Sequence, residues 1–312
     1  MTQTNPFPSD KGKSNISPLW DSVKELYNSF DLNTFRLIGG INDRLGIWSA
    51  RDSSTRYYKS LMYEFALYLN EIFEKQSIHE GFKIEDLLPK IQCQNLGSPP
   101  TIRFEGFDVS LDYLLGLEEY AFCRDALDKS VSVCEIGAGF GRTCHTLLSL
   151  TDVESYTIID LPELLALSKA YLYQVLNEKE FKKITFLSAD NCKSVGEFDL
   201  AINIDSLQEM PNEVGKAYLD LIADKARYFF TKNVMGKYSP SDIDLEITNQ
   251  SQFESAMQMG LMTDKLNLFD TVSRAEAVKI YHQKFCPSGF SLFKTQRGFG
   301  QYFSYELSMF EK

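Results

Sequence analysis

A run of three alternating glycines, at positions 137, 139 and 141, restricts the fold of this chain more than any other feature. It comes directly after a short apolar run and directly before an apolar helical segment at 143–150. Glycine allows a tight turn and, lacking a Cβ, lets a ligand approach the backbone closely. The free N–H groups at the start of the following helix favour a negatively charged group. The stretch is therefore predicted to join a strand to a helix and to bind a carboxylate or a phosphate.

Short apolar runs separated by helical segments follow one another from residue 131 onward. They are predicted as buried strands, and their alternation with helices favours a parallel sheet with right-handed crossovers. Pro162 marks the first turn of the helix that follows Asp160. Two final runs, at 290–295 and 301–310 with a glycine-containing turn between them, predict a closing hairpin. The five strands predicted before that hairpin are 131–136, 156–159, 184–187, 200–204 and 228–234.

The front of the chain, residues 18–130, is predicted to be mainly helical, because apolar residues recur at spacings of three and four. The break Gly-Ser-Pro-Pro at 97–100 precedes a small predicted hairpin at 101–110. Ser110 is the expected N-cap of a helix that runs to about Leu127. The apolar face of an earlier helix is predicted to include Tyr63, Leu67, Leu69, Ile72 and Phe73.

The chain is accordingly divided into three parts. Residues 1–17 are expected to be a disordered or extended tail, 18–130 a helical cap or substrate region, and 131–312 an α/β domain. The segment 235–289 lacks strong strand signals and carries two predicted helices, near 251–259 and 273–285. Because an insertion of this length is uncommon as plain loop, it is a candidate lid.

Charge and composition exclude several kinds of partner. The chain has 43 Asp and Glu against 32 Lys and Arg, a net charge of −11, which repels nucleic acid and anionic membranes unless the basic residues cluster. No apolar run approaches the roughly 18 residues that span a bilayer, and the first twenty residues lack a secretory signal. The six cysteines form no C-x-x-C pair, which suits a reducing compartment, so a cytoplasmic location is expected.

The glycine spacing separates two classes of ligand. Dinucleotide sites favour G-x-G-x-x-G, whereas this turn is G-x-G-x-G and carries Arg142 where the third glycine would stand. Asp160 follows at the end of the second predicted strand, where its carboxylate could accept both hydroxyls of a ribose. Asp160 lies 23 residues after Gly137, and this separation suits either class of ligand. The glycine spacing alone therefore weakens the dinucleotide interpretation.

The pattern E-x-G-x-G-x-G at 135–141, with an acidic residue ending the second strand, resembles the class I methyltransferases that use S-adenosylmethionine. The resemblance implies a doubly wound, Rossmann-like, mostly parallel seven-stranded sheet with an antiparallel C-terminal hairpin strand. The segments EIGAGFGRT at 135–143, IIDLPELL at 158–165 and NIDSLQEM at 203–210 are similar to a bacterial family of sugar O-methyltransferases, and so is the NLGSPP segment at 95–100.

This resemblance implies a set of cofactor-binding residues. Glu135 would organise the turn, Asp160 would hold the ribose, and Asp190 with Asn191 would lie near the adenine. An N-terminal helix cap is the alternative for Asp160, and an ordinary strand-to-loop turn is the alternative for the other pair. The full implied set is Glu135, Gly137, Ala138, Gly139, Gly141, Asp160, Leu161, Asp190, Asn191 and Asn203.

Methyl transfer to oxygen requires an aligned acceptor and the removal of one proton. Asp205, Ser206 and Glu209 follow the fourth strand, where the resemblance places the transferred methyl group; the alternative is a solvated helix start capped by Asp205 or Ser206. His282 lies in the late insertion, beside the expected substrate mouth, and is a candidate base together with Glu209 and Asp205. His145 is expected to be packed or exposed rather than catalytic.

Basic and aromatic residues concentrate near the N-terminus, and this mixture suits a phosphorylated or nucleotide-linked sugar. Arg51 and Arg56 are the predicted contacts there, with ordinary surface ion pairs as the alternative. Arg142 and Ser206 complete the predicted substrate contacts, although Arg142 could instead pair with Glu135. The basic and aromatic residues of this group are Arg36, Arg44, Trp48, Arg51, Arg56, Tyr57, Tyr58 and Lys59.

The expected function is O-methylation of a sugar hydroxyl in bacterial surface-glycan biosynthesis, with S-adenosylmethionine as donor and S-adenosylhomocysteine as product. Alternatives are methylation of another small metabolite, a non-catalytic cofactor-binding subunit, and a nicotinamide-dependent oxidoreductase. No metal-ligand motif is present, so no structural metal is predicted. A Mg²⁺ ion that assists deprotonation of a sugar diol is left open, as is a homo-oligomer.

Overall fold

The computed structural model describes residues 30–37, 55–76, 83–127, 130–243, 247, 250–267, 269–299 and 305–312, without the side chains of 55–58 and 252. Its α-helices are α3 (Thr55–Gln76), α4 (Ile84–Leu87), α5 (Leu111–Cys123), α6 (Arg142–Leu150), α7 (Pro162–Val175), α8 (Glu178–Phe181), α9 (Asn212–Lys225), α10 (Gln250–Gln258) and α11 (Thr271–Phe285). Its 3₁₀ turns are Leu88–Lys90, Arg124–Ala126, Ala189–Ser194, Ser206–Gln208 and Pro240–Ile243.

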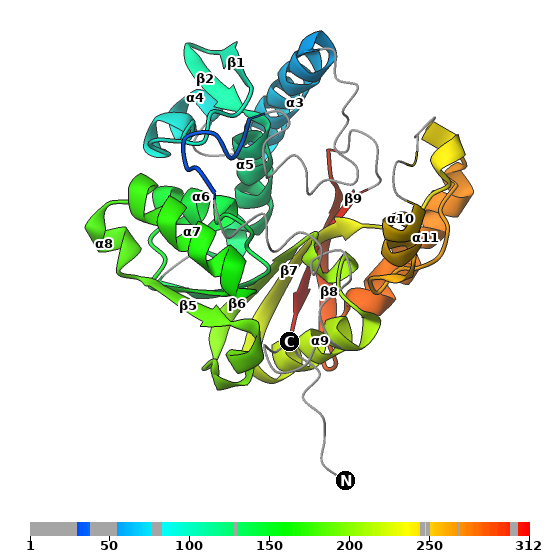
Figure 1. Cartoon of the computed structure of the whole chain (residues 1–312). Helices are drawn as coiled ribbons and strands as arrows, with labels where there is room; N and C mark the ends of the chain where they lie inside the picture. The colour runs from blue at the N-terminus through cyan, green and yellow to red at the C-terminus, as the bar shows by residue number, and fades with distance from the viewer. Residues whose placement is uncertain are drawn as a thin grey trace.

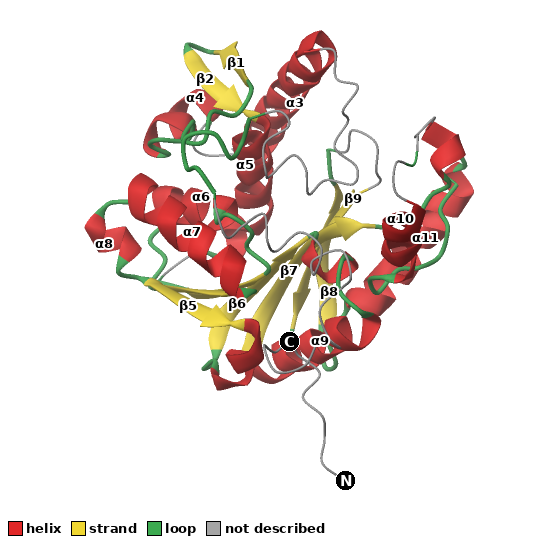
Figure 2. Ribbon diagram, viewed as in Figure 1, coloured by secondary structure: helices red, strands yellow, loops and turns green. Residues whose placement is uncertain are grey.

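The predicted sheet is confirmed as one seven-stranded sheet in the order β5-β4-β3-β6-β7-β9-β8 (Figure 2). Strands β3 to β7 are parallel, whereas β9 is antiparallel to both β7 and β8. The order reverses between β3 and β6, and ligands of open α/β sheets bind at such a switch point. The strands are β3 (Ser132–Ile136), β4 (Ser155–Asp160), β5 (Ile184–Ser188), β6 (Phe198–Ile204), β7 (Ala226–Val234), β8 (Ser291–Arg297) and β9 (Tyr305–Glu311).

Helices cover both faces of this sheet (Figure 1). On β3, Val133 packs into the core formed with α3, α5, α6 and α7, whereas Cys134 and Ile136 pack into the core formed with α9 and α11. Successive side chains of a strand point to opposite faces, so a strand covered on both faces is apolar along its whole length. This explains why continuous apolar runs marked the strands in the sequence.

The front region shares its hydrophobic core with the sheet. It contains the predicted hairpin, formed by β1 (Thr101–Phe104) and β2 (Phe107–Ser110). The predicted stripe on α3 is partly wrong, because Tyr63 and Leu67 are 40% and 52% exposed. The neighbouring stripe is buried instead, with the ring of Phe65 stacked on Phe299 at 4.2 Å between centroids. Three-and-four spacing fits two adjacent stripes, and packing selects between them. The domain boundary at 130 stays a prediction.

Ser110 precedes α5 as predicted, but its side chain does not cap the helix. Its Oγ accepts a hydrogen bond from Nη2 of Arg36 at 2.9 Å. Arg36 belongs to the group of basic and aromatic residues that the sequence suggested for a phosphorylated sugar. It is 4% exposed and also donates hydrogen bonds to Asp112 and to the carbonyl groups of Gln94 and Leu96. The guanidinium thus makes five hydrogen bonds, as many as it has N–H donors, and serves the fold.

The candidate lid at 235–289 is partly a packed layer of the domain. Tyr281 and Phe285 of α11 are completely buried, so α11 covers the sheet rather than closing over it. The segment before α11 is tied to the sheet by Gln208, whose side chain accepts a hydrogen bond from the Met262 amide and donates one to the Val234 carbonyl. None of the helices that the structure describes is long and apolar enough to cross a membrane.

Candidate active site

The glycine turn follows β3 and leads into α6 as predicted. Gly137, Gly139 and Gly141 all have left-handed backbones, with φ of 76°, 58° and 92°. A Cβ on Gly137 would overlap the side chain of Ser206, and one on Gly141 would lie 2.8 Å from Leu172. A Cβ on Gly139 would meet nothing within 4 Å. The outer glycines therefore serve close packing, while the middle one leaves the backbone open to a ligand.

Asp160 ends β4 and lies directly against this turn. Its Oδ2 accepts a hydrogen bond from the Gly139 amide at 3.0 Å, and its Oδ1 accepts one from the Leu161 amide at 2.8 Å. Burial raises the pKa of Asp160 to about 7, although these backbone donors oppose the shift. The N-cap of α7 is Leu161, so the interpretation of Asp160 as a helix cap is wrong.

Glu135 lies beneath the turn rather than in it. The carboxylate is buried, and its Oε2 accepts a hydrogen bond from the Tyr156 hydroxyl at 2.7 Å. Burial raises the pKa of Glu135 to about 7, against the Tyr156 hydrogen bond, which lowers it. Glu135 therefore links β3 to β4 below the glycine turn.

We expect the substitution Glu135→Gln to make stability less dependent on pH. The raised pKa means that the folded protein binds a proton that the unfolded chain releases above about pH 4.5. Protonated Glu135 therefore adds roughly 3 kcal/mol to the free energy of unfolding below about pH 4.5, and this contribution is lost as the pH rises through about 7. Urea unfolding at pH 5 and pH 8 measures the effect. The exposed Glu213→Gln should retain the wild-type dependence, and an equal dependence in Glu135→Gln would contradict the prediction.

Asn203 and Ser206 join β6 to the glycine turn. Nδ2 of Asn203 donates to the Ile136 carbonyl at 2.9 Å and to Ser206 Oγ, while its Oδ1 accepts from Asn233. The Ser206 hydroxyl donates to the same Ile136 carbonyl at 3.0 Å. Asn203 is fully buried, and these hydrogen bonds position the turn. The predicted substrate contact Ser206 likewise supports Gly137.

Asp205 follows β6 with an unusual backbone, φ 60°, which only a few residue types adopt readily. Its amide donates to the Lys232 carbonyl at 2.9 Å, and its carboxylate accepts a hydrogen bond from Tyr305. Burial raises the pKa of Asp205 to about 6, while Lys232 opposes the shift. The predicted capping role is absent, because its side chain makes no cap hydrogen bond. Glu209, four residues on, is partly buried.

A buried charge network, absent from the sequence predictions, lies on the α5 side of the sheet. Nζ of Lys232 is 2.8 Å from Glu118 Oε2 and 3.2 Å from Glu119 Oε1. Arg142 Nη2 is 2.5 Å from Glu119, so the suggested ion pair of Arg142 with Glu135 is replaced by one with Glu119. Two adjacent acids within an apolar helix and a lysine within a predicted buried strand were signals in the sequence, since buried charges require partners.

His282 lies apart from Asp205. His282 Nε2 is 3.1 Å from Thr295 Oγ1 and 3.4 Å from Glu306 Oε1, on the sheet face that α11 covers. Asp205 interacts with Lys232, whose side chain lies on the opposite face of the sheet, against α5. The structure therefore does not bring these two candidate bases together. Burial lowers the pKa of His282. His145 is buried against Tyr113, which confirms that it is packed.

The remaining predicted residues lie at the edge of the site or outside the described parts. Asp190 and Asn191 follow β5, at the same sheet edge as Asp160, and Asn191 donates to Asp190 Oδ1 at 3.1 Å. Arg51 and the side chain of Arg56 fall outside the described residues. Among the described residues, no three His, Cys, Asp or Glu side chains are grouped to hold a metal ion.

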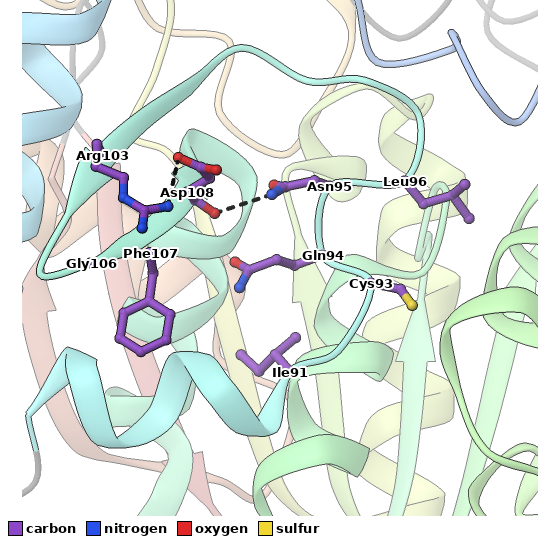
Figure 3. Close-up of a pocket in the computed structure, with 9 residues that line it drawn as sticks. All are labelled: Ile91, Cys93, Gln94, Asn95, Leu96, Arg103, Gly106, Phe107 and Asp108. Atoms are coloured by element: carbon purple, nitrogen blue, oxygen red, sulfur yellow. Dashed lines mark hydrogen bonds and ion pairs between the residues drawn. The ribbon is translucent and has the colours of Figure 1, made fainter.

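A cavity of about 530 Å³ lies between residues 91–96 and the β1–β2 hairpin (Figure 3). Gln94 and Phe107 line it, and Arg103 forms an ion pair with Asp108 at 3.3 Å on its rim. None of its lining residues belongs to the glycine turn or the large sheet, so this cavity is separate from the candidate site.

The solved structures to which this chain is similar include two methyltransferases. No family model and no curated protein matches the chain. Magnesium protoporphyrin IX methyltransferase from Synechocystis, solved with S-adenosylhomocysteine, is 12% identical over 83% of this chain and 97% of that one, with a TM-score of 0.44. Human N-acetylserotonin methyltransferase, solved with S-adenosylmethionine, is 16% identical over 64% of this chain and 56% of that one, with a TM-score of 0.40. At these scores the fold assignment rests on the strand order itself.

Proposed function

We propose that this chain binds S-adenosylmethionine at the glycine turn and methylates a hydroxyl oxygen. The observation that carries the proposal is the open, left-handed Gly139 beside the Asp160 carboxylate at the switch point of the sheet. When bound, this cofactor supplies a methyl group activated by a positively charged sulfur. The first turn of α6, directly after the glycine turn, can bind its carboxylate through backbone N–H groups, and Asp160 can accept hydrogen bonds from its ribose.

Asp205 is the favoured general base of the proposed reaction. It follows β6, whose neighbour β3 leads into the glycine turn, and its pKa of about 6 leaves it ionised near neutral pH and able to accept a proton. The hydrogen bond from Tyr305 holds the carboxylate in place. Glu209 and His282 are the alternatives, and Asp190 and Asn191 keep their proposed place beside the adenine.

We expect Asp160→Ala to abolish the rise in melting temperature that S-adenosylhomocysteine produces in the wild type. Loss of hydrogen bonds to a charged acceptor should weaken binding by about 10- to 100-fold. Thermal shift and calorimetry measure this, with Asp160→Asn as a variant that keeps the shape of the side chain. Asp224→Ala, an exposed carboxylate at the end of α9, is the control. An unchanged shift in Asp160→Ala would remove Asp160 from the site.

The proposed acceptor is a sugar hydroxyl in bacterial surface-glycan biosynthesis, supported by the resemblance in residues 135–143, 158–165 and 203–210. Transfer of a radiolabelled methyl group from S-adenosylmethionine to nucleotide sugars and phosphosugars, with and without Mg²⁺, tests this proposal. Comparison of Asp205→Asn with His282→Ala identifies the base. Methylation of amines or carboxylates but of no hydroxyl would refute sugar O-methylation, and binding without any transfer would favour a non-catalytic subunit.

A further inference from the structure

Two buried acids beneath the candidate site, Glu118 and Glu119, are paired with cations. Lys232 contacts both Glu118 and Glu119, and Arg142 contacts Glu119. These are two acids and two bases in direct contact, and Lys232 and both acids are at most 3% exposed. Because these cations already neutralise the two glutamates, they offer Asp205 only partial compensation.

Asp205 lies at the switch point, where a ligand held by the glycine turn would extend. The residue after it, Ser206, binds the Ile136 carbonyl and packs on Gly137. The charged and titratable groups that act on Asp205 are Lys232 of β7, Arg142 of α6, Glu119 of α5 and Tyr305 of β9. The carboxylate is therefore a surplus negative charge beside the turn, in surroundings where charges interact more strongly than in water.

We propose that Asp205 makes this site selective for charge, so that a cationic ligand binds more tightly than a neutral ligand of the same shape. The inference rests on the proposed function, because S-adenosylmethionine carries a positive sulfur whereas S-adenosylhomocysteine is a neutral thioether. The Asp205 carboxylate then favours the replacement of bound S-adenosylhomocysteine by S-adenosylmethionine.

Calorimetry with two stable ligands tests this inference without an acceptor. S-adenosylhomocysteine is the neutral probe, and sinefungin, which carries an ammonium group where the donor carries its methylated sulfur, is the cationic probe. We expect the preference for sinefungin to grow about fivefold from pH 5 to pH 7.5, as Asp205 ionises. Asp160 and Glu135 also ionise in this range and attract a cation, but Asp205→Asn retains both, so the part of the rise that this variant loses belongs to Asp205.

Asp205→Asn removes the charge and should fold, because asparagine tolerates a left-handed backbone. In this variant most of the rise in the ratio of the two affinities between pH 5 and pH 7.5 should be lost. The exposed Glu213→Gln is the control and should behave as the wild type. A ratio independent of pH in the wild type, or one that rises as steeply in Asp205→Asn as in the wild type, would overturn the inference. Failure of both probes to bind the wild type at any pH would instead refute the proposed function.

Discussion

Replacement of Gly139 by alanine is expected to lower the affinity for S-adenosylhomocysteine by about 100-fold while the protein stays folded. The position is left-handed, so alanine costs roughly 1–2 kcal/mol of backbone strain. Its Cβ would meet no protein atom within 4 Å and would instead occupy the space that we assign to the ligand. Binding should therefore suffer far more than stability. Calorimetry and thermal unfolding of the same preparation measure the two effects.

Two other glycines provide matched controls for this substitution. Gly289 has a similar left-handed backbone, φ 80°, and equally open surroundings, but it lies before β8, outside the candidate site. Gly289→Ala should cost the same stability and leave binding unchanged. Gly137→Ala should lower stability strongly, because its Cβ would overlap Ser206. If Gly139→Ala binds S-adenosylhomocysteine as the wild type does, the ligand does not lie on this face of the turn.

The substitution Arg36→Ala is expected to reduce the free energy of unfolding by about 3–5 kcal/mol. Arg36 is buried and donates two hydrogen bonds to Asp112 Oδ2, at 2.7 and 2.9 Å. Its other donors bind the Ser110 hydroxyl and two carbonyl groups of the segment 94–96. Truncation would leave these acceptors without their donors and detach residues 30–37 from α5. Urea unfolding monitored by tyrosine fluorescence measures the loss.

Two further arginine variants make this prediction specific. Arg36→Lys should restore only part of the stability, because an ammonium group cannot reproduce the planar fork of donors. Arg103→Ala removes an exposed ion pair with Asp108 and should cost less than about 1 kcal/mol. Equal losses in Arg36→Ala and Arg103→Ala would show that the buried network contributes no more than a surface pair.

Local patterns predicted most of the α/β domain correctly. The five apolar runs became β3 to β7, because strands covered on both faces must be apolar along their length. Pro162 marks the start of α7, since proline suits the first helical position, where its missing N–H costs nothing. The predictions for Tyr63 and Leu67 failed because their spacing is shared by the adjacent stripe, and only contact with Phe299 and α5 distinguishes the two.

The glycine turn, the strands beside it and the carboxylate of Asp160 follow from patterns within short stretches of chain, because backbone conformation and burial periodicity are local properties. The partners of the buried charges do not follow from such patterns. Arg36 and Asp112 are 76 residues apart, and Lys232 and Glu119 are 113 apart. A buried charge must find an opposite charge, but which one it meets depends on how distant elements pack. The packing of distant elements therefore placed Arg36 and Arg142 in ion pairs with Asp112 and Glu119, and it left Asp205 at the site without an ion pair of its own.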